Sequence, residues 1–282
     1  MNTANLITLR VWGDFACFTR PEMKVERVSY PVMTPSAARG ILEAVFWEPQ
    51  MYYLIDSIRV VKRGQWISIR RNEVTRVISL DNAKTWMHSP EKFSPIQAGG
   101  TQRNMLALQD VEYLITAEVR LTPLAQPPRD NLGKYLREIE GRARSGKCFH
   151  RPGLGMREFA ADFDWESDPE AALARRAAEL SQSTAINEPL GLMLYDLFDH
   201  RARAAGFRWL TPDEEAQQTA DFDQTLADLK KSEQTKRRKE FVSTRLRSSS
   251  AAIKPEPLFF QASLKNSCLD CHPDRVLAQG GN

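Results

Sequence analysis

The chain has 282 residues, of which 42% are hydrophobic and 27% charged, and its formal net charge is +3 at neutral pH. These values are typical of a globular protein with one large domain or two smaller ones. No apolar run approaches the roughly 18 residues of a membrane-spanning helix, which excludes a membrane protein of that kind. The first residues, MNTANLITLRVWGD, lack the features of a signal peptide, so we expect a cytoplasmic protein.

The chain begins with a predicted strand and a predicted helix. The segment LITLRVWGDFACF at 6–18 alternates between apolar and polar residues, as a strand does. The next helix begins after Thr34, which can cap its first turn, and Pro35 loses nothing there because that turn leaves its N–H groups unpaired. Pro49 stops the helix. Phe46 lies at the edge of its apolar face.

Strands follow this helix. Residues 51–63 and 64–74 read as two strands joined by a tight turn at Arg63–Gly64. Residues 75–108 contain two prolines and a Gly-Gly pair, which predict a long irregular excursion. Residues 111–121 then predict another strand.

The second half of the chain predicts more helix. Residues 130–147 and 168–182 read as helices, and residues 188–198 read as a strand. A charged, polar segment follows at about 199–254, and a strand pair closes the chain.

This order of elements predicts an α+β fold. We expect a ferredoxin-like (RRM-like) domain at 1–125. The rest of the chain, 126–282, contains the polar, helical segment at about 199–254 that is named the insertion below. A sheet of the first kind is a common platform for single-stranded RNA.

The insertion contains two blocks of opposite charge. Residues 211–228 hold six acidic residues and no basic one, a net charge of −6. Residues 230–247 hold eight lysines and arginines against two glutamates, a net charge of +6. We interpret the blocks as solvated helices that neutralise each other, and a basic arm for nucleic acid is the alternative.

The motif CLDCH near the C-terminus has the C-x-x-C-H spacing of c-type haem attachment. Haem is attached in this way outside the cytoplasm, which does not suit a chain that lacks an export signal. A zinc site would need a fourth ligand, because Cys268, Cys271 and His272 supply only three. The alternating residues before the motif favour a terminal strand, turn and strand. We therefore expect no cofactor and no metal.

Three segments carry a family resemblance. Residues 11–49, the stretch SIRRNEV at 68–74 and residues 141–163 together resemble the type I-C subtype of CRISPR-associated Cas family-five proteins. The resemblance implies a ferredoxin-like domain at 1–125 followed by a smaller antiparallel β-sheet domain at 126–282, in which the insertion at about 199–254 departs from the family pattern. It implies a subunit that cuts the repeat of precursor CRISPR RNA for antiviral defence. It also implies that the subunit keeps the 5′ handle within a Cascade complex, beside backbone and large subunits, and meets target DNA only through that complex.

The chemistry that the resemblance implies is a metal-independent attack of a ribose 2′-hydroxyl on the adjacent phosphate. In the family a tyrosine at the end of the first helix and a Lys-His pair are associated with this reaction. The tyrosine corresponds to Phe46, the lysine to Lys134 and the histidine to Tyr135. Because tyrosine has a reference pKa of about 10, Tyr135 is expected to be mostly neutral near pH 7 and a weak general base. Its alternative roles are to orient the 2′-hydroxyl or to act as an acid.

His150 is the nearby histidine, and histidine is well suited to proton transfer near neutral pH. It is either a compensating base or a structural or RNA-contacting residue. The candidate catalytic residues are therefore Lys134, Tyr135 and His150.

The expected RNA-binding residues are cations and aromatics within or near the matching segments. Arginine suits bidentate contact with phosphate, and aromatic rings stack on bases. For any one of them a solvated or packing role is the alternative. The set comprises Arg20, Lys24, Arg27, Arg39, Phe46, Trp47, Arg70, Arg71, Arg142, Arg144, Lys147 and Arg151.

Two functions remain open from the sequence. The first is an endoribonuclease that cuts CRISPR repeat RNA and retains its 5′ handle. The second is a subunit with the same fold that binds the handle and does not cut. The overall resemblance favours the first, and the changes at Phe46 and Tyr135 favour the second.

Overall fold

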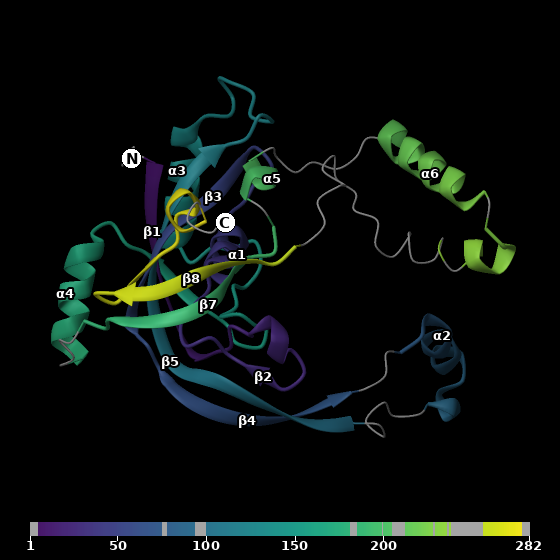
Figure 1. Ribbon diagram of the computed structural model, residues 1–282, viewed down its shortest axis with the longest axis horizontal. Helices are drawn as coiled ribbons and strands as arrows, with labels where there is room; N and C mark the ends of the chain where they lie inside the picture. Colours follow the sequence, from purple (N-terminus) through teal and green to yellow (C-terminus); the bar gives the residue numbers. More distant parts are fainter. Residues whose placement is uncertain are drawn as a thin grey trace.

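A computed structural model describes residues 5–74, 78–93, 100–180, 185–198, 200–204, 212–227, 229–235, 237 and 256–277. One nine-stranded sheet organises the fold (Figure 1). Its strands are β1 (Leu6–Ala16), β2 (Arg27–Val28), β3 (Met51–Lys62), β4 (Gln65–Val74), β5 (Gly100–Leu121), β6 (Asp162–Trp165), β7 (Glu188–Asp196), β8 (Leu258–Lys265) and β9 (Cys268–Asp270). The order across the sheet is β6-β1-β5-β3-β9-β8-β7, and β2 and β4 also pair with β5.

The helices surround this sheet. They are α1 (Pro35–Val45), α2 (Leu80–His88), α3 (Leu132–Arg144), α4 (Pro169–Leu180), α5 (His200–Ala204), α6 (Pro212–Leu226) and α8 (Pro273–Val276), with short 3-10 turns at Pro21–Met23 and Pro90–Lys92. The mixed fold with a large, mainly antiparallel sheet confirms the predicted class at this level. No helix among the described residues is both long enough and apolar enough to cross a membrane.

Helix α1 forms where the sequence predicts it. The Thr34 hydroxyl accepts a hydrogen bond from the Ala37 N–H at 3.2 Å, and Pro35 occupies the first turn. The helix ends earlier than Pro49, because Phe46 adopts an extended backbone with φ of −157°. The predicted apolar face is buried and consists of Ala38, Ile41, Leu42 and Val45.

Helices α1 and α3 contact each other and share one hydrophobic core with the sheet. The core takes side chains from β1, β3 and β5 on the sheet side and from both helices on the other. Leu9, Ile58 and Ile115 are among its fully buried residues, together with Ile41 of α1 and Ile139 of α3. This packing fixes the end of α1 beside α3.

The predicted tight turn at Arg63–Gly64 is wrong. Strands β3 and β4 both run antiparallel to β5, with Lys62 opposite Glu112 before the break and Gln65 opposite Gln109 after it. They therefore continue in one direction along the same partner. Gly64 has φ of +79°, and a Cβ there would lie 2.6 Å from the Gln109 carbonyl oxygen. Glycine permits a kink in the ribbon at this point, not a reversal.

The reversal of the chain falls instead between Val74 and Gly100, within the segment predicted as irregular. Two parts of that segment are regular. Residues 80–88 form α2, and residues 100–108 belong to the long strand β5. The β4–β5 ribbon with α2 at its end, named the arm below, extends away from the rest of the sheet (Figure 1).

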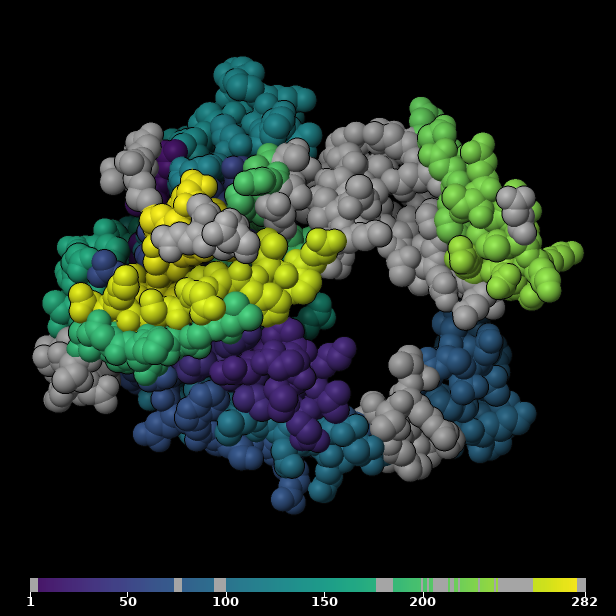
Figure 2. Space-filling model, viewed as in Figure 1, coloured from purple at the N-terminus to yellow at the C-terminus, as the bar shows by residue number. Residues whose placement is uncertain are grey.

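The C-terminal strands continue the main sheet, which differs from the separate small sheet expected. β9 pairs with β3 through Ser57 opposite Asp270 and Arg59 opposite Cys268, and β8 and β7 follow outward. The predicted strand, turn and strand at the C-terminus are confirmed as β8 and β9. Figure 2 shows β7 and β8 as adjacent bands across the front of the molecule, with α2 and α6 to the right.

The insertion predicted at about 199–254 is helical where it is described, in α5 and α6. Helix α6 covers most of the acidic block. Of the basic block at 230–247, only residues 230–235 and 237 belong to the described part of the chain. Its pairing with the acidic block stays a prediction.

Candidate functional site

Phe46 and Tyr135, two of the residues that the resemblance relates to catalysis, meet where α1 ends against α3. Phe46 directly follows α1, and its ring centroid lies 6.2 Å from that of Tyr135 on α3. The Arg142 guanidinium lies 5.2 Å from the centre of the Phe46 ring. The Tyr53 hydroxyl donates to the Phe46 carbonyl at 2.8 Å. Phe46 is only 6% exposed, which argues for packing and against contact with RNA.

Tyr135 is completely buried, and its hydroxyl donates to an Asp130 carboxylate oxygen at 2.9 Å. Burial, followed by the hydrogen bond and charge of Asp130, raises the pKa of the Tyr135 phenol above its ordinary value. The phenol is therefore neutral at physiological pH and uses its proton to hold Asp130. This geometry does not suit the base role considered for Tyr135.

Asp130 has three donors around its carboxylate. They are the Gln126 backbone N–H at 3.0 Å, the Tyr135 hydroxyl at 2.9 Å and the Lys134 ammonium at 3.4 Å. The Gln126 N–H is the largest cause that lowers the pKa of the Asp130 carboxyl, and Tyr135 and Lys134 lower it further. Asp130 is thus an ionised, buried anchor for the residues around it.

Lys134 is the exposed member of this group. Its ammonium lies 4.9 Å from the centre of the Tyr135 ring, and 39% of its side chain is exposed. Asn131 caps α3 by accepting the Lys134 backbone N–H at 2.9 Å. The cap and the ion pair with Asp130 together hold a cation at the surface, where it can meet a phosphate.

We expect the stability of the protein to depend on Asp130 as the pH falls. Because its folded-state pKa is below that of the unfolded chain, its contribution is present above about pH 4 and is lost as pH falls through the folded value. Asp130→Asn is expected to lower stability at pH 7 and to flatten this acid-side loss. Urea unfolding at pH values from 7 to 3 measures both effects. An Asp130→Asn curve parallel to the wild type would contradict the expectation.

His150 lies beside the end of α1 through its backbone. The Ala44 carbonyl, in the last turn of α1, accepts the N–H of Phe149 at 2.8 Å and that of His150 at 3.3 Å. The His150 side chain is exposed and meets the Phe149 ring edge to face, with centroids 5.9 Å apart. The loop after α3 is therefore attached two residues before Phe46.

Most of the predicted RNA-binding residues near α3 are exposed cations with acidic neighbours. Arg142 pairs with Glu138 at 2.9 Å and Arg144 with Glu140 at 2.9 Å. Arg151 pairs with Asp162 at 2.6 Å. Such exposed pairs contribute little to stability, so these arginines can exchange partners for phosphate. Among the described residues Lys147 has no ion pair, and Trp47 is 38% exposed.

A second group of predicted cations lies around β2 and β4, at the opposite side of the view from α3 (Figure 1). Arg20 stacks on Tyr30, with 4.9 Å from its guanidinium to the ring centre. Arg27 pairs with Glu73 at 3.8 Å, and Arg71 pairs with Glu73 and Glu158. Within the described part of the chain, Lys24 and Arg70 are exposed and form no ion pair. The structure thus divides the predicted set into two surfaces.

Arg39 is the predicted cation least able to contact phosphate. Its guanidinium donates to Asp196 at 2.7 and 2.9 Å and to Glu43 at 2.6 Å, and only 14% of the side chain is exposed. Burial alone would lower the pKa of Arg39, but Glu43 and Asp196 raise it above its ordinary value. Arg203 of α5 also pairs with Glu43. These four residues join α1, β7 and α5.

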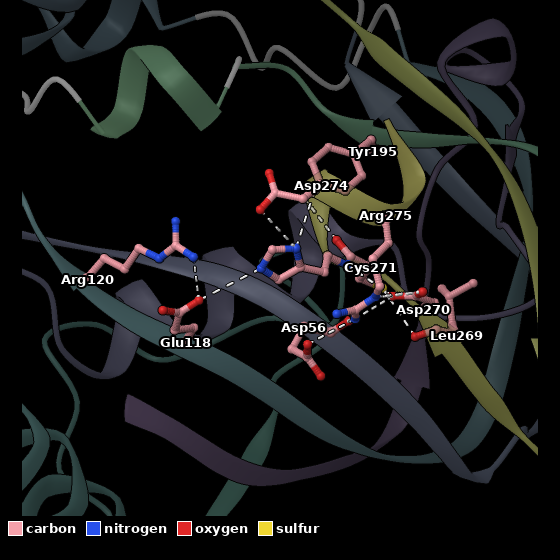
Figure 3. Close-up of polar contacts among 10 residues, drawn as sticks. Asp56, Glu118, Arg120, Tyr195, Leu269, Asp270, Cys271, Asp274 and Arg275 are labelled. Carbon is pink, nitrogen blue, oxygen red and sulfur yellow. Dashed lines mark hydrogen bonds and ion pairs between the residues drawn. The ribbon is translucent and has the colours of Figure 1, made fainter. Parts of the chain in front are cut away.

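The CLDCH motif has structural contacts of its own (Figure 3). Cys271 is buried and its thiol donates to the Leu269 carbonyl at 3.5 Å. The His272 ring accepts the Asp274 N–H at 3.3 Å and so caps α8, while its other nitrogen lies 3.8 Å from Glu118. The described residues contain no group of three or more His, Cys, Asp or Glu side chains placed to hold a metal ion.

Arg275 attaches this C-terminal segment to the sheet. It pairs with Asp56 of β3 at 2.9 Å and with Asp270 at 2.6 Å. Burial would raise the pKa of the Asp270 carboxyl, but the hydrogen bond from Arg275 and that from the His272 N–H lower it. The motif therefore fits the structural interpretation, in which its strand β9 joins β8 to β3.

Sequence reasoning missed Asp130. A signal was present, because Asp130 precedes Lys134 by four residues, the spacing at which an acidic and a basic side chain interact along a helix. Asp196 and Arg203 had no comparable local signal, since their partners are about 160 residues away in the chain.

Comparison with known proteins adds independent findings. Residues 6–245 match the family model Cas_Cas5d, described as "CRISPR-associated protein (Cas_Cas5)". A protein of Mannheimia succiniciproducens named CRISPR pre-crRNA endoribonuclease Cas5d is 42% identical over 201 residues, which cover 70% of this chain and 87% of that protein. A Thermus thermophilus protein of the same name is 41% identical over 191 residues, covering 68% and 72%.

The fold also has a counterpart among solved structures. One titled "Crystal Structure of CRISPR-associated Protein" superposes with a TM-score of 0.50 at 17% sequence identity, covering 94% of this chain and 90% of that one. At this identity the likeness concerns the fold alone.

Proposed function

The chain belongs to the Cas5d family of CRISPR-associated proteins, and from that membership we propose that it is an endoribonuclease that cuts pre-crRNA. The observation that carries the proposal is the meeting of Lys134, Tyr135 and Phe46 beside the loop of His150. These positions come from separate parts of the chain, yet Tyr135 and Phe46 pack together in the interior, Lys134 lies over the Tyr135 ring, and the loop of His150 is hydrogen-bonded to the last turn of α1. Lys134 and the His150 side chain are the parts of this group at the surface.

The reaction we propose is an attack of the ribose 2′-oxygen on the neighbouring phosphorus, with cleavage of the bond from phosphorus to the 5′-oxygen. A base takes the 2′-hydroxyl proton, and an acid gives a proton to the departing oxygen. The products are a 2′,3′-cyclic phosphate and a 5′-hydroxyl. No metal ion is required for this step.

Lys134 supplies the cation that stabilises the negative charge that develops on the phosphate. His150 exchanges the proton, because its imidazole is exposed and its backbone N–H donates to the Ala44 carbonyl in the last turn of α1. Tyr135 acts through Asp130 and Lys134 and is a positioning residue. Arg142, Arg144, Lys147 and Arg151 contact the RNA backbone around this surface.

The surrounding architecture fits the proposal. Across the sheet the strands have the order β6-β1-β5-β3. Along the chain, α1 comes between β1 and β3, and α3 comes between β5 and β6. Both orders support a ferredoxin-like unit. The pairing of β6 with β1 supports including α3 and β6 in that unit, beyond the boundary predicted at residue 125. In this proposal the protein works in the cytoplasm and retains the 5′ handle within a Cascade complex.

The test is incubation of the purified protein with its cognate repeat RNA in EDTA, followed by analysis of the product ends. A single cut with a 2′,3′-cyclic phosphate supports the proposal. A cut that requires Mg²⁺ contradicts the mechanism, and intact RNA that is tightly bound contradicts cleavage.

A second candidate function is binding of the 5′ handle without cleavage. It is favoured by one observation: Phe46 has no hydroxyl, and the Tyr135 hydroxyl is buried against Asp130. The double variant Phe46→Tyr, Tyr135→His restores the residues that the family resemblance implies. Cleavage by this variant and none by the wild type would establish the second function.

We expect Tyr135→Phe to keep cleavage within about threefold of the wild type, because a neutral, buried phenol supplies no base. Loss of its hydrogen bond to a charged carboxylate is expected to cost about 1.5–3 kcal/mol of folding stability. Single-turnover rates and urea unfolding of the same preparation separate the two effects. A rate loss of about a hundredfold in a folded Tyr135→Phe variant would contradict this expectation and would show that the phenol takes part in catalysis.

A further inference from the structure

Phe149 lies beside the proposed site, but it neither packs in the hydrophobic core nor takes part in the proposed reaction. Phe149 is 85% exposed, the highest value among the large hydrophobic residues whose surroundings the structure describes. Exposing a whole phenyl ring to water is unfavourable, since burial of an apolar side chain of this size stabilises a protein. An exposed ring of this size therefore suits a surface that is covered by a ligand.

The backbone of Phe149 is held in place. Its N–H donates to the Ala44 carbonyl at 2.8 Å, and the next N–H, of His150, donates to the same oxygen at 3.3 Å. The turn before it is also ordered by hydrogen bonds, with the Lys147 N–H donating to the Arg142 carbonyl at 2.9 Å. The ring thus projects from an anchored loop, which lowers the entropy lost when a ligand binds.

The surroundings of this ring favour a nucleic acid. His150 packs against it edge to face, with an angle of 82° between the rings, and leaves most of Phe149 open. The same loop and the end of α3 carry Arg142, Arg144, Lys147 and Arg151. Glu138, Glu140 and Asp162 balance three of these cations in exposed pairs, which a phosphate can replace.

We propose that Phe149 stacks on an unpaired base of the repeat RNA next to the phosphate that is cut. The inference rests on the proposed function, because it places that phosphate at Lys134 and His150. A base inside a duplex shows no free face, so the stacked base must be single-stranded or displaced. Phe149 is therefore a residue that helps to select the position of the cut.

The test uses repeat RNA with a 2′-deoxy ribose at the cut, so that it stays intact, and with 2-aminopurine at bases flanking that position. Phe149→Ala and Phe149→Leu are expected to bind about tenfold more weakly, about 1.4 kcal/mol, and to lose the fluorescence quenching caused by stacking. Phe149→Trp retains both. Phe259→Ala on β8, a phenylalanine that is 38% exposed, is the matched control and is expected to change neither.

The outcomes separate this inference from the function that it rests on. If the wild type cuts the unmodified repeat and Phe149→Ala shows unchanged affinity and quenching, the stacking proposal is wrong and the function stands. If the wild type fails to bind the repeat at all, the proposed function fails first. Unchanged RNA binding by Phe149→Ala combined with loss of assembly with partner subunits would identify the ring as a protein contact and overturn the proposal.

Discussion

Lys134→Ala is expected to lower the single-turnover rate of repeat cleavage by about 10²–10³-fold, the loss seen when one group that stabilises transition-state charge is removed. RNA binding is expected to change by less than about fivefold, because the cations around α3 remain. The fold should persist, since Asp130 keeps its hydrogen bonds from Gln126 and Tyr135. Rapid-quench cleavage assays and filter binding with the same RNA measure the two quantities.

Two variants control this result. Lys134→Arg keeps the charge and is expected to recover part of the rate, although a planar guanidinium occupies the space differently. Lys265→Ala removes an exposed lysine at the end of β8 and is expected to cut at the wild-type rate. Equal losses in Lys134→Ala and Lys265→Ala would indicate a general effect of charge and would refute a local role for Lys134.

The largest expected effect on stability is that of Asp196→Ala. This change leaves Arg39 and Arg203 facing Glu43 alone, in a place where the Arg39 side chain is 14% and that of Arg203 7% exposed. Removing one partner of a buried ion pair costs about 3–5 kcal/mol. We expect roughly 3 kcal/mol here because Glu43 still neutralises one arginine. The free energy of unfolding in urea, with circular dichroism as the probe, measures the loss.

A double variant distinguishes an unpaired charge from simple loss of packing. Arg39→Met with Asp196→Leu removes both charges and leaves the pair of Glu43 and Arg203. Buried ion pairs can often be replaced by hydrophobic residues at little cost, so this variant should recover roughly half of the loss or more. A double variant as unstable as Asp196→Ala would show that packing, not charge, explains the effect.

The parts of the fold that the sequence predicted correctly depend on neighbours within one turn or one strand. Thr34 and Pro35 are enough to begin α1, and the apolar spacing from Ala38 to Val45 marks its buried face. These signals act within a few residues. They do not depend on what the rest of the chain does.

The incorrect predictions of the fold share a different cause. A glycine with positive φ occurs both in tight turns and in kinks, and only the position of β5 shows that Gly64 is a kink. The docking of β9 against Ser57 and Arg59 of β3 likewise depends on segments more than 200 residues apart. Tertiary pairing of this kind leaves no local pattern to read.

In the candidate site, too, the residues can be named from the sequence, but their contacts cannot. The family resemblance brought Lys134 and Tyr135 to attention, but it could not show that the Tyr135 hydroxyl points to Asp130. Nor could it show that Arg39 is occupied by Asp196. The resemblance named these residues, and the structure shows the partners that decide what each side chain can do.

The 22-residue strand β5 has a consequence for the way the molecule opens. Residues 112–118 lie between β1 and β3, whereas residues 100–104 have β4 as their neighbour among the described strands. Local unfolding of the arm therefore breaks hydrogen bonds at one end of β5 and leaves the other end intact. Amide protons of one continuous strand are expected to exchange with solvent deuterium at two very different rates, with the step near Met105, where β2 begins to pair with the other edge of β5.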